Sequence, residues 1–318
     1  VFDPIKGLYS NGFKKKETSY KIHNNKIILD NAKTIPSISK TNKNLLTKIR
    51  FFNHAFLQVE SEGIKFATDP WAIGPAFNTG WWLKNNTKND WEKELNSCNF
   101  IYISHNHPDH LHPQTLDKID KEIPIVVPNF ISDSTGKYID SLGFKNIFRF
   151  NLGKEYKMTN SNLYLSILKS GDFREDSGIY FSNGNLTCLF DVDSNIINFN
   201  KLPNVDIYAS SFAGGASGYP LMFDNYKIEE KKKILKKEMS MIKNFTINSI
   251  KKIKPKYFIP YASYFEEKLD RDKEIKRLNK KNNILDYKNL TKKLNIEVLD
   301  IPKYDSFEFK NKKLINCE

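Results

Sequence analysis

The sequence contains little cysteine, little arginine and no long apolar run. Its cysteines, Cys98, Cys188 and Cys317, are scattered and form no C-x-x-C pair, which argues against a disulfide framework and against a thiolate zinc site. No Cys-x-His pair is present, so the ligands of a Rieske iron–sulfur centre are missing. No stretch approaches the roughly 20 consecutive apolar residues of a membrane span. We therefore expect no membrane partner.

The first residues show no basic-then-apolar signal pattern, which makes the cytoplasm the expected location. The chain starts at Val1 rather than Met, which leaves open whether residues precede it.

The formal net charge is +13, which raises the question of nucleic-acid binding because phosphate contacts drive such binding. Only five of the 50 basic residues are Arg, however, and the Lys residues are spread along the chain. This pattern indicates solvated Lys faces rather than one basic site, so a nucleic-acid partner is not expected. An anionic small-molecule substrate also suits the charge.

The composition and periodicity of the sequence change near residue 49. Residues 1–48 are polar and weakly periodic, which predicts an N-terminal extension, whereas 49–318 contain the strand and helix patterns of one domain. Strands are predicted at 50–59, 64–68, 123–127, 163–168, 179–181, 186–190, 205–210, 257–260 and 296–301, with a hairpin turn at 60–63. Helices are predicted at 113–121, 132–142 and 226–254. This order predicts an α/β fold with two packed sheets covered by helices.

Four potential metal ligands, His105, His107, Asp109 and His110, follow directly after the strand-like run 100–104. The chain has only six histidines, and four of them lie in or next to this motif, which argues against a merely solvated loop. Imidazoles and a carboxylate together suit a divalent transition metal. His105 and His107 point the same way along an extended segment, so this pair can hold one metal while the next pair holds a second.

Two acidic residues in predicted loops are further candidate ligands. Asp193 follows the predicted strand 186–190, where a carboxylate can bridge two metals, although a turn-forming Asp is the simpler interpretation. Asp172 has the same two interpretations. His54 lies inside the predicted strand 50–59, where a histidine more often packs in the core or orients a ligand than binds a metal itself.

Two loops are candidate substrate contacts. The segment 212–220 brings together Gly214, Gly215 and Ser217, and such small residues let backbone N–H groups approach an anion. It lacks the ending of a P-loop, so a tight loop beside the site is the alternative. The segment 71–82 is aromatic and irregular, with core packing as the alternative to stacking on a nucleobase or sugar. Its candidate stacking residues are Trp71, Trp81 and Trp82.

The motif His105-x-His107-x-Asp109-His110, with the hairpin before it and Asp193 after it, resembles the metallo-β-lactamase superfamily. More narrowly, several runs look like those of the CMP-N-acetylneuraminate hydroxylases, and the likeness extends over about 49–267. These runs are 53–55, 69–77, 80–82, 101–105, 212–218 and Pro260-Tyr261-Ala262-Ser263-Tyr264-Phe265.

The resemblance implies an αββα sandwich with the metal site along one edge of its two sheets. It implies that the first metal is held by His105 and His107 and the second by Asp109 and His110, with Asp193 as the bridge. Asp172 stands where the superfamily usually has another His, and no His lies near Tyr261, where a last ligand is usual. Because this set is rich in carboxylate, we expect one or two ions, with iron favoured and zinc or manganese as alternatives.

The resemblance further implies an oxygenase-type oxidoreductase, a hydroxylase with a diiron centre acting on a nucleotide-linked sugar or similar anionic metabolite. Asp109 and Asp193 would be catalytic, and Tyr261 and His54 are added to the candidate substrate contacts. The hydroxylases carry a Rieske domain, which this sequence lacks, so either a separate electron-donor protein supplies the electrons or the chemistry differs. The alternative is a metal-dependent hydrolase of an ester, amide or phosphodiester bond, in which Asp109 orients the nucleophile.

Overall fold

The computed structural model describes residues 46–158, 161–194, 197, 202–214, 218–301 and 303–318 in full. Two further strands, β1 (Tyr20–His23) and β2 (Lys26–Leu29), are described by their backbone and pair with each other antiparallel. The rest of the predicted extension 1–48 lies outside the described residues, apart from 46–48, which already belong to the sandwich.

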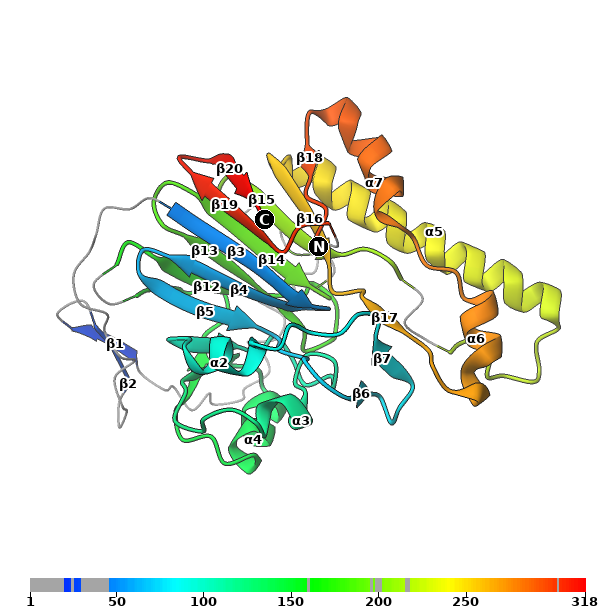
Figure 1. Cartoon of the computed structure of the whole chain (residues 1–318), viewed down its shortest axis with the longest axis horizontal. Helices are drawn as coiled ribbons and strands as arrows, with labels where there is room; N and C mark the ends of the chain where they lie inside the picture. The colour runs from blue at the N-terminus through cyan, green and yellow to red at the C-terminus, as the bar shows by residue number, and fades with distance from the viewer. Residues whose placement is uncertain are drawn as a thin grey trace.

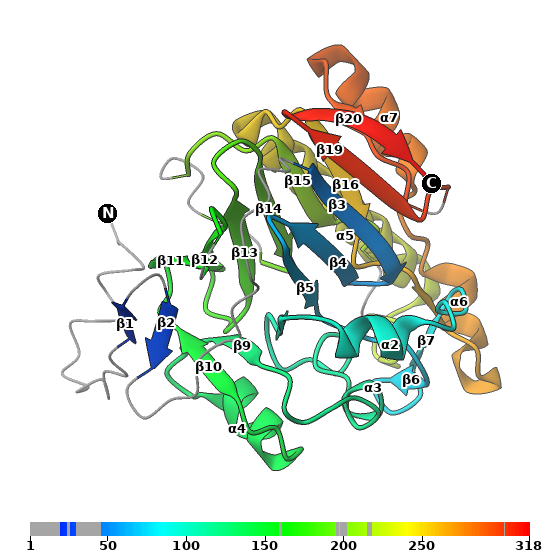
Figure 2. The same ribbon diagram turned by 60° about the vertical axis from the view of Figure 1, so that its left-hand side comes forward.

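Two sheets pack face to face in the centre of the molecule (Figures 1 and 2). The first sheet runs through β10 (Ile147–Phe150), β9 (Ile125–Pro128), β8 (Phe100–Tyr102), β5 (Ile64–Thr68), β4 (Phe56–Ser61), β3 (Leu46–Asn53), β19 (Ser306–Lys310) and β20 (Lys313–Cys317). The second runs through β11 (Glu155–Lys157), β12 (Tyr164–Lys169), β13 (Ser177–Ser182), β14 (Thr187–Val192), β15 (Ile207–Ser211), β16 (Tyr257–Tyr261) and β18 (Glu297–Val298).

The space between the sheets is filled by apolar side chains from both inner faces. Phe66 of the first sheet meets Phe181 of the second edge to face, with ring centroids 5.3 Å apart. Both side chains are almost fully buried, and burial of one such ring stabilises the fold by roughly 1.5–3 kcal/mol. Central strands such as β8, β9 and β16 are buried on both faces, so successive side chains pack alternately between the sheets and under the helices.

Helices cover the outer face of each sheet. The first sheet is covered by α2 (Trp91–Asn96), α3 (Pro113–Leu116) and α4 (Ser134–Ser141), and the second by α5 (Ile228–Ile253) and α7 (Ile284–Thr291), with α6 (Lys273–Leu278) between these two in sequence. Leu95 and Ile139 pack on the first sheet, whereas Ile250 and Tyr287 pack on the second. The predicted αββα sandwich is confirmed.

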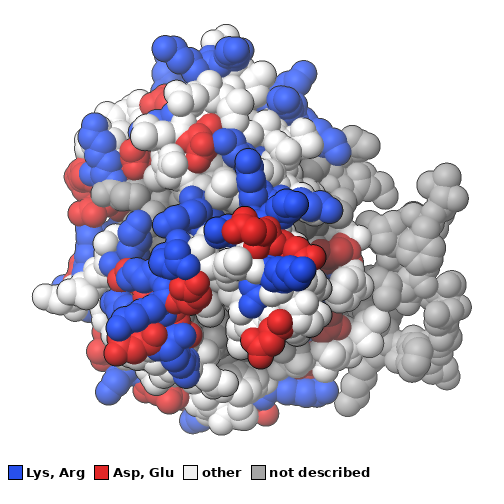
Figure 3. Space-filling view, turned by 90° about the vertical axis from the view of Figure 1, so that its right-hand side faces the viewer, with Lys and Arg blue, Asp and Glu red and all other residues white. Residues whose placement is uncertain are grey.

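The predicted helices at 132–142 and 226–254 are present as α4 and α5, and the predicted turn at 60–63 joins β4 to β5. The helix predicted at 113–121 is shorter, since α3 ends at Leu116. Among the described residues, none of the helices combines the length and apolar character needed to span a bilayer. On the face shown in Figure 3, Lys and Arg lie among Asp and Glu rather than in one uniformly basic area.

A small sheet of β6 (Pro75–Ala76), β7 (Trp81–Leu83) and β17 (Phe265–Glu266) lies beside one edge of the sandwich (Figure 1). β8 lies between parallel neighbours in the first sheet, as β15 does in the second. Loops that follow the carboxyl ends of parallel strands commonly form ligand sites. The loops after β8 and after β14 are the ones that carry the histidine motif and Asp193.

Candidate metal centre

The loop after β8 brings the four residues of the histidine motif together. His105, Asp109 and His110 are buried, whereas His107 is exposed. His105 Nε2 lies 2.8 Å from His107 Nδ1, and His110 Nε2 lies 3.2 Å from Asp109 Oδ2. A short loop that is fixed at both ends by buried neighbours therefore presents three imidazoles and a carboxylate at one point.

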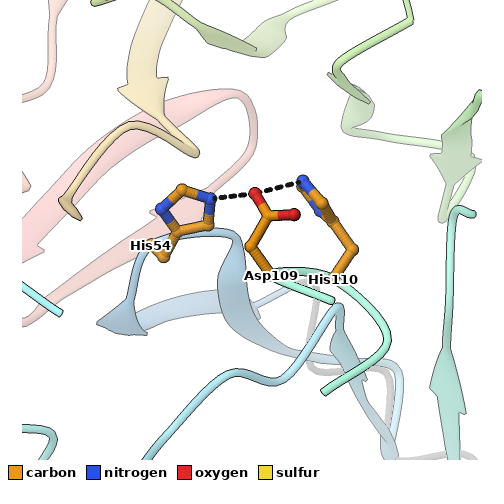
Figure 4. A group of neighbouring side chains, drawn as sticks. All are labelled: His54, Asp109 and His110. Carbon is orange, nitrogen blue, oxygen red and sulfur yellow. Dashed lines mark hydrogen bonds and ion pairs between the residues drawn. The ribbon is translucent and has the colours of Figure 1, made fainter. Parts of the chain in front are cut away.

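The candidate ligands form two groups in which the ligand atoms all lie within 4.8 Å of one another. One group consists of His105, His107 and Asp193, and the other of His54, Asp109 and His110 (Figure 4). The structure thus places the two predicted ligand pairs in separate groups. Each group is completed by a residue from elsewhere in the chain.

Asp193 lies between the two groups. It follows β14, which ends in a bulge and at Val192 with a positive φ of 54°, and this turn directs the carboxylate into the site. Its carboxylate belongs to the group of His105 and also lies 3.5 Å from His110 Nε2. A bridging carboxylate, as predicted, would need this intermediate position.

His54 occupies a turn, so the prediction of one continuous strand over 50–59 is wrong. The chain bends between β3 and β4, where His54 has a φ of 41° and its N–H donates to the side chain of Asn53. No Gly or Pro marks this turn, and the apolar residues around it read as one strand. The bend turns the buried imidazole inward, and His54 Nε2 lies 3.1 Å from Asp109 Oδ2 (Figure 4).

Asp176, rather than Asp172, faces the histidines. Asp172 accepts hydrogen bonds from the guanidinium of Arg174, from Nε at 2.9 Å and from Nη2 at 2.8 Å, and it belongs to neither ligand group. Asp176 is buried, with Oδ1 3.9 Å from His105 Nε2. Asp172 was the predicted ligand of this loop, but the structure places Asp176 beside His105, although Asp176 also lies outside the two ligand groups. The loop contains several acidic residues, and the sequence does not show which one turns inward.

The buried charges of the site balance one another. Burial opposes the charge of Asp109, but the neighbouring imidazoles of His110 and His54 outweigh it and hold the pKa of this carboxyl well below its usual value. Burial also opposes a charged His110, yet Asp109 and Asp193 raise the pKa of this imidazole well above its usual value. His105 differs, because burial and the neighbouring His110 lower its pKa well below the usual value. The surroundings thus favour the protonated form of His110 and the neutral form of His105.

A further layer of hydrogen bonds fixes the motif from behind. Asp69 is fully buried and accepts from the backbone N–H and the hydroxyl of Ser104, each at 2.7 Å. The same carboxylate lies 3.1 Å from His110 Nδ1, and the Ser104 hydroxyl lies 2.8 Å from His105 Nδ1. Partners of this kind set the orientation of a ligating imidazole. Asp69 was not predicted as a site residue, although its place at the end of β5 is a signal that could have indicated it.

A cavity of about 180 Å³ opens beside the two ligand groups. Asp109 and Asp193 line it on the side of the candidate ligands, and Trp81 and Phe265 form an aromatic wall, stacked with centroids 3.8 Å apart. Its polar lining includes Arg174, Ser210, Ser211, Thr246 and Ser263.

The predicted substrate contacts are placed differently from one another. Trp81 and Gly214 line the cavity. Trp71 and Tyr261 are fully buried and do not line it, so the structure does not support substrate contact by these two side chains. Trp71 instead packs edge to face against His54, with centroids 5.2 Å apart. Trp82 lies in β7, outside the cavity lining, with its indole N–H donating to the carbonyl of Thr79. Gly215 and Ser217 lie outside the described residues.

The donor set fits a transition metal. Asp109 Oδ1 is buried and has no hydrogen-bond partner among the residues that the structure describes, so a cation there would satisfy an otherwise unpaired oxygen. Buried imidazoles and carboxylates that converge from separate loops are the ligands such a metal uses. The metal-binding role of each named residue remains a prediction.

Comparison with known proteins agrees with this description. Residues 48–199 match the model of the beta-lactamase superfamily domain. The chain is 35% identical over 246 residues to the cytidine monophosphate-N-acetylneuraminic acid hydroxylase of Xenopus laevis. The aligned region covers 74% of this chain and 41% of that protein. The chain therefore spans less than half the length of this curated relative.

Solved structures share the fold at low identity. A metallo hydrolase from Ignicoccus hospitalis, Igni18, has a TM-score of 0.56 at 13% identity and covers 83% of this chain and 99% of its own. CmlA, a diiron beta-hydroxylase from Streptomyces venezuelae, has a TM-score of 0.55 at 16% identity and covers 83% of this chain and 54% of its own. These likenesses show a common architecture.

Proposed function

We propose, from the premise that this chain belongs to the metallo-β-lactamase superfamily, that it is an O2-dependent hydroxylase with iron in the candidate metal centre. The observation that carries the proposal is the donor set, in which Asp109, Asp176 and Asp193 lie with the imidazoles. Carboxylate ligands shift metal preference away from zinc and toward iron or manganese. The proposed substrate is a nucleotide-linked sugar or a similar anionic small molecule.

The names of similar proteins also support hydroxylation. A relative 35% identical to the chain is named a hydroxylase of a nucleotide-linked sugar acid, and a solved diiron hydroxylase shares the fold. The hydrolase alternative is supported only by fold neighbours such as Igni18, and one fold can host both chemistries. The carboxylate-rich donor set supports iron and thereby the proposal of hydroxylation.

In this proposal, bound iron supplies the redox chemistry that activates O2. Asp193, which lies between the ligand groups, holds the two positions together, and Asp109 anchors the second group with His54 and His110. The cavity of about 180 Å³ beside these residues takes the reacting end of the substrate. Trp81 offers that end an apolar wall and Ser211 a hydroxyl.

Hydroxylation places one oxygen atom of O2 into a C–H bond and reduces the other to water, which consumes two electrons and two protons. The proposed electron source is a separate donor protein. The net positive charge of +13 suits both an anionic substrate and an acidic donor surface.

The test is to prepare the chain without air, load it with Fe²⁺ and supply CMP-N-acetylneuraminic acid, isotopically labelled O2 and a chemical reductant. We expect O2 uptake that depends on the substrate and a product that carries one labelled oxygen atom. The variant His105→Ala, loaded in the same way, is the matched negative control. A zinc-loaded chain that cleaves an ester or phosphodiester without a reductant would contradict the proposal.

A further inference from the structure

Arg174 connects the two loops that supply carboxylates to the candidate metal centre. Its guanidinium forms an ion pair with Asp176, Nη1 to Oδ2 at 2.9 Å, and Nη2 donates to the backbone carbonyl of Asp193 at 3.2 Å. The same guanidinium donates to Asp172 through Nε and Nη2. One planar group therefore contacts the loop before β13 and the turn after β14 at the same time.

The backbone around Arg174 is held by a second cation. Lys169 Nζ donates to the carbonyls of Ser170, Asp172 and Arg174 at 3.1, 3.0 and 2.8 Å. This ammonium closes the loop on itself and fixes the point from which the Arg174 side chain starts. Because its backbone is already fixed, the Arg174 side chain loses less conformational entropy when it forms these contacts.

A guanidinium suits this task because its donors are arranged in a rigid planar fork, whereas an ammonium is a point charge. Asp172 accepts from Nε and Nη2 on one edge of the fork, and Nη1 forms the ion pair with Asp176. Asp176 directly precedes β13 and Asp193 directly follows β14, and these two strands pair antiparallel. Strand pairing brings the two loops together, and Arg174 adds a side-chain contact to each of them beside His105.

We propose that Arg174 is a positioning residue that holds Asp176 and the Asp193 turn where their carboxylates can bind metal together with His105. This inference rests on the proposed metal-dependent function. In this inference, Asp172 orients the guanidinium of Arg174 by accepting its hydrogen bonds.

The test compares Arg174→Gln and Arg174→Lys with the wild type, using Co²⁺ alone as the probe. Arg149→Gln is the matched control, because Arg149 forms a similar ion pair with Asp133, Nε to Oδ1 at 2.7 Å, away from the ligand groups. Affinity is measured by competition with a chelator, ligand geometry by the visible absorption of bound Co²⁺, and folding by the melting temperature of the metal-free protein.

We expect Arg174→Gln to weaken Co²⁺ binding by about 10–100-fold, as loss of an orienting partner does, and to change the absorption spectrum. Arg174→Lys keeps the charge but not the fork, so it should recover only a small part of this loss. Wild-type affinity and spectrum in Arg174→Gln, or a loss no greater than that of Arg149→Gln, would overturn the inference. Failure of the wild type itself to bind Co²⁺ would instead overturn the proposed function.

Discussion

The two halves of the candidate metal centre are built in different ways. The histidine half comes from one short segment, 105–110, which follows the buried strand β8 and is held from behind by Asp69 and Ser104. The carboxylate half comes from two loops of the other sheet, one before β13 and one after β14, and Arg174 contacts both of them beside the pairing of these two strands. Asp193 is also more exposed, with 31% of its side chain accessible compared with none for His110. The histidine half therefore comes from one continuous segment, the local half, whereas the carboxylate half is assembled from two separate loops, the assembled half.

This difference teaches where changes in the two halves should act. A ligand lost from the local half removes a fixed anchor, because the other imidazoles cannot move to replace it. A ligand lost from the assembled half leaves the imidazoles in place, so binding is weakened rather than abolished. The predictions below test this contrast from the strongest expected effect to the weakest.

The largest effect is expected for His105→Ala, which removes the buried imidazole at the centre of the first ligand group. We expect purified protein without stoichiometric metal and without measurable O2 uptake. Metal content by mass spectrometry measures the loss. His112→Asn is the matched control, because His112 caps α3 by accepting from the N–H of Thr115 and Asn can take that role. Equal metal content in His105→Ala and the wild type would refute the assignment.

The next effect separates Asp176 from Asp172, which share one loop and one charge. We expect Asp176→Asn to weaken Co²⁺ binding by about 10–100-fold or more, since an amide is a poorer ligand than a carboxylate. Asp172→Asn should weaken it less, because Asp172 contacts Arg174 and not the histidines. Titration with a competing chelator ranks the two. The reverse order would favour the assignment made from sequence.

A smaller effect is expected for His54→Gln, which changes the residue that joins Asp109 and His110 from another part of the first sheet. Because the group of His105 and His107 stays intact, one metal should still bind. If the wild type binds two Fe²⁺ ions per chain, we expect His54→Gln to bind one. The number of bound ions is measured by titration under nitrogen. An unchanged number of ions in a two-metal wild type would remove His54 from the ligand set.

The same contrast explains what could be predicted from sequence. The histidine half was predictable because all four residues lie within six positions of one another after a strand, so spacing alone places them together. The sandwich was predictable for a similar reason, since periodicity is local and the long helix α5 has a clear apolar stripe. The comparisons confirm the superfamily and the fold on independent grounds.

The missed features depend on contacts between distant segments. His54 was assigned to a strand because the turn between β3 and β4 contains no Gly or Pro, and only the positive φ reveals it. Asp176 was missed because its loop contains several acidic residues and only the folded loop shows that Asp176 lies beside His105. The hairpin of β19 and β20 was missed because its strands are short, partly charged and paired at the edge of the first sheet.

The smallest expected effect is a dependence of metal binding on pH that comes from the histidine half. In the metal-free protein, neighbouring carboxylates hold the pKa of His110 well above its usual value, which favours the protonated imidazole. Metal ligation needs the neutral imidazole, and binding must therefore release that proton. His105, whose pKa is well below its usual value, has none to release.

The sign of this effect differs between affinity and stability. A raised His pKa stabilises the metal-free fold below the unfolded pKa, and this stabilisation is lost as the pH rises through the folded pKa. Metal affinity moves the other way and should increase with pH over the same range. Calorimetric titration with Co²⁺ in buffers of different ionisation enthalpy should show release of about one proton per chain near neutral pH. If His110→Ala releases as many protons on Co²⁺ binding as the wild type, the proton comes from another group. The pH dependence of binding would then not arise from the histidine half of the site.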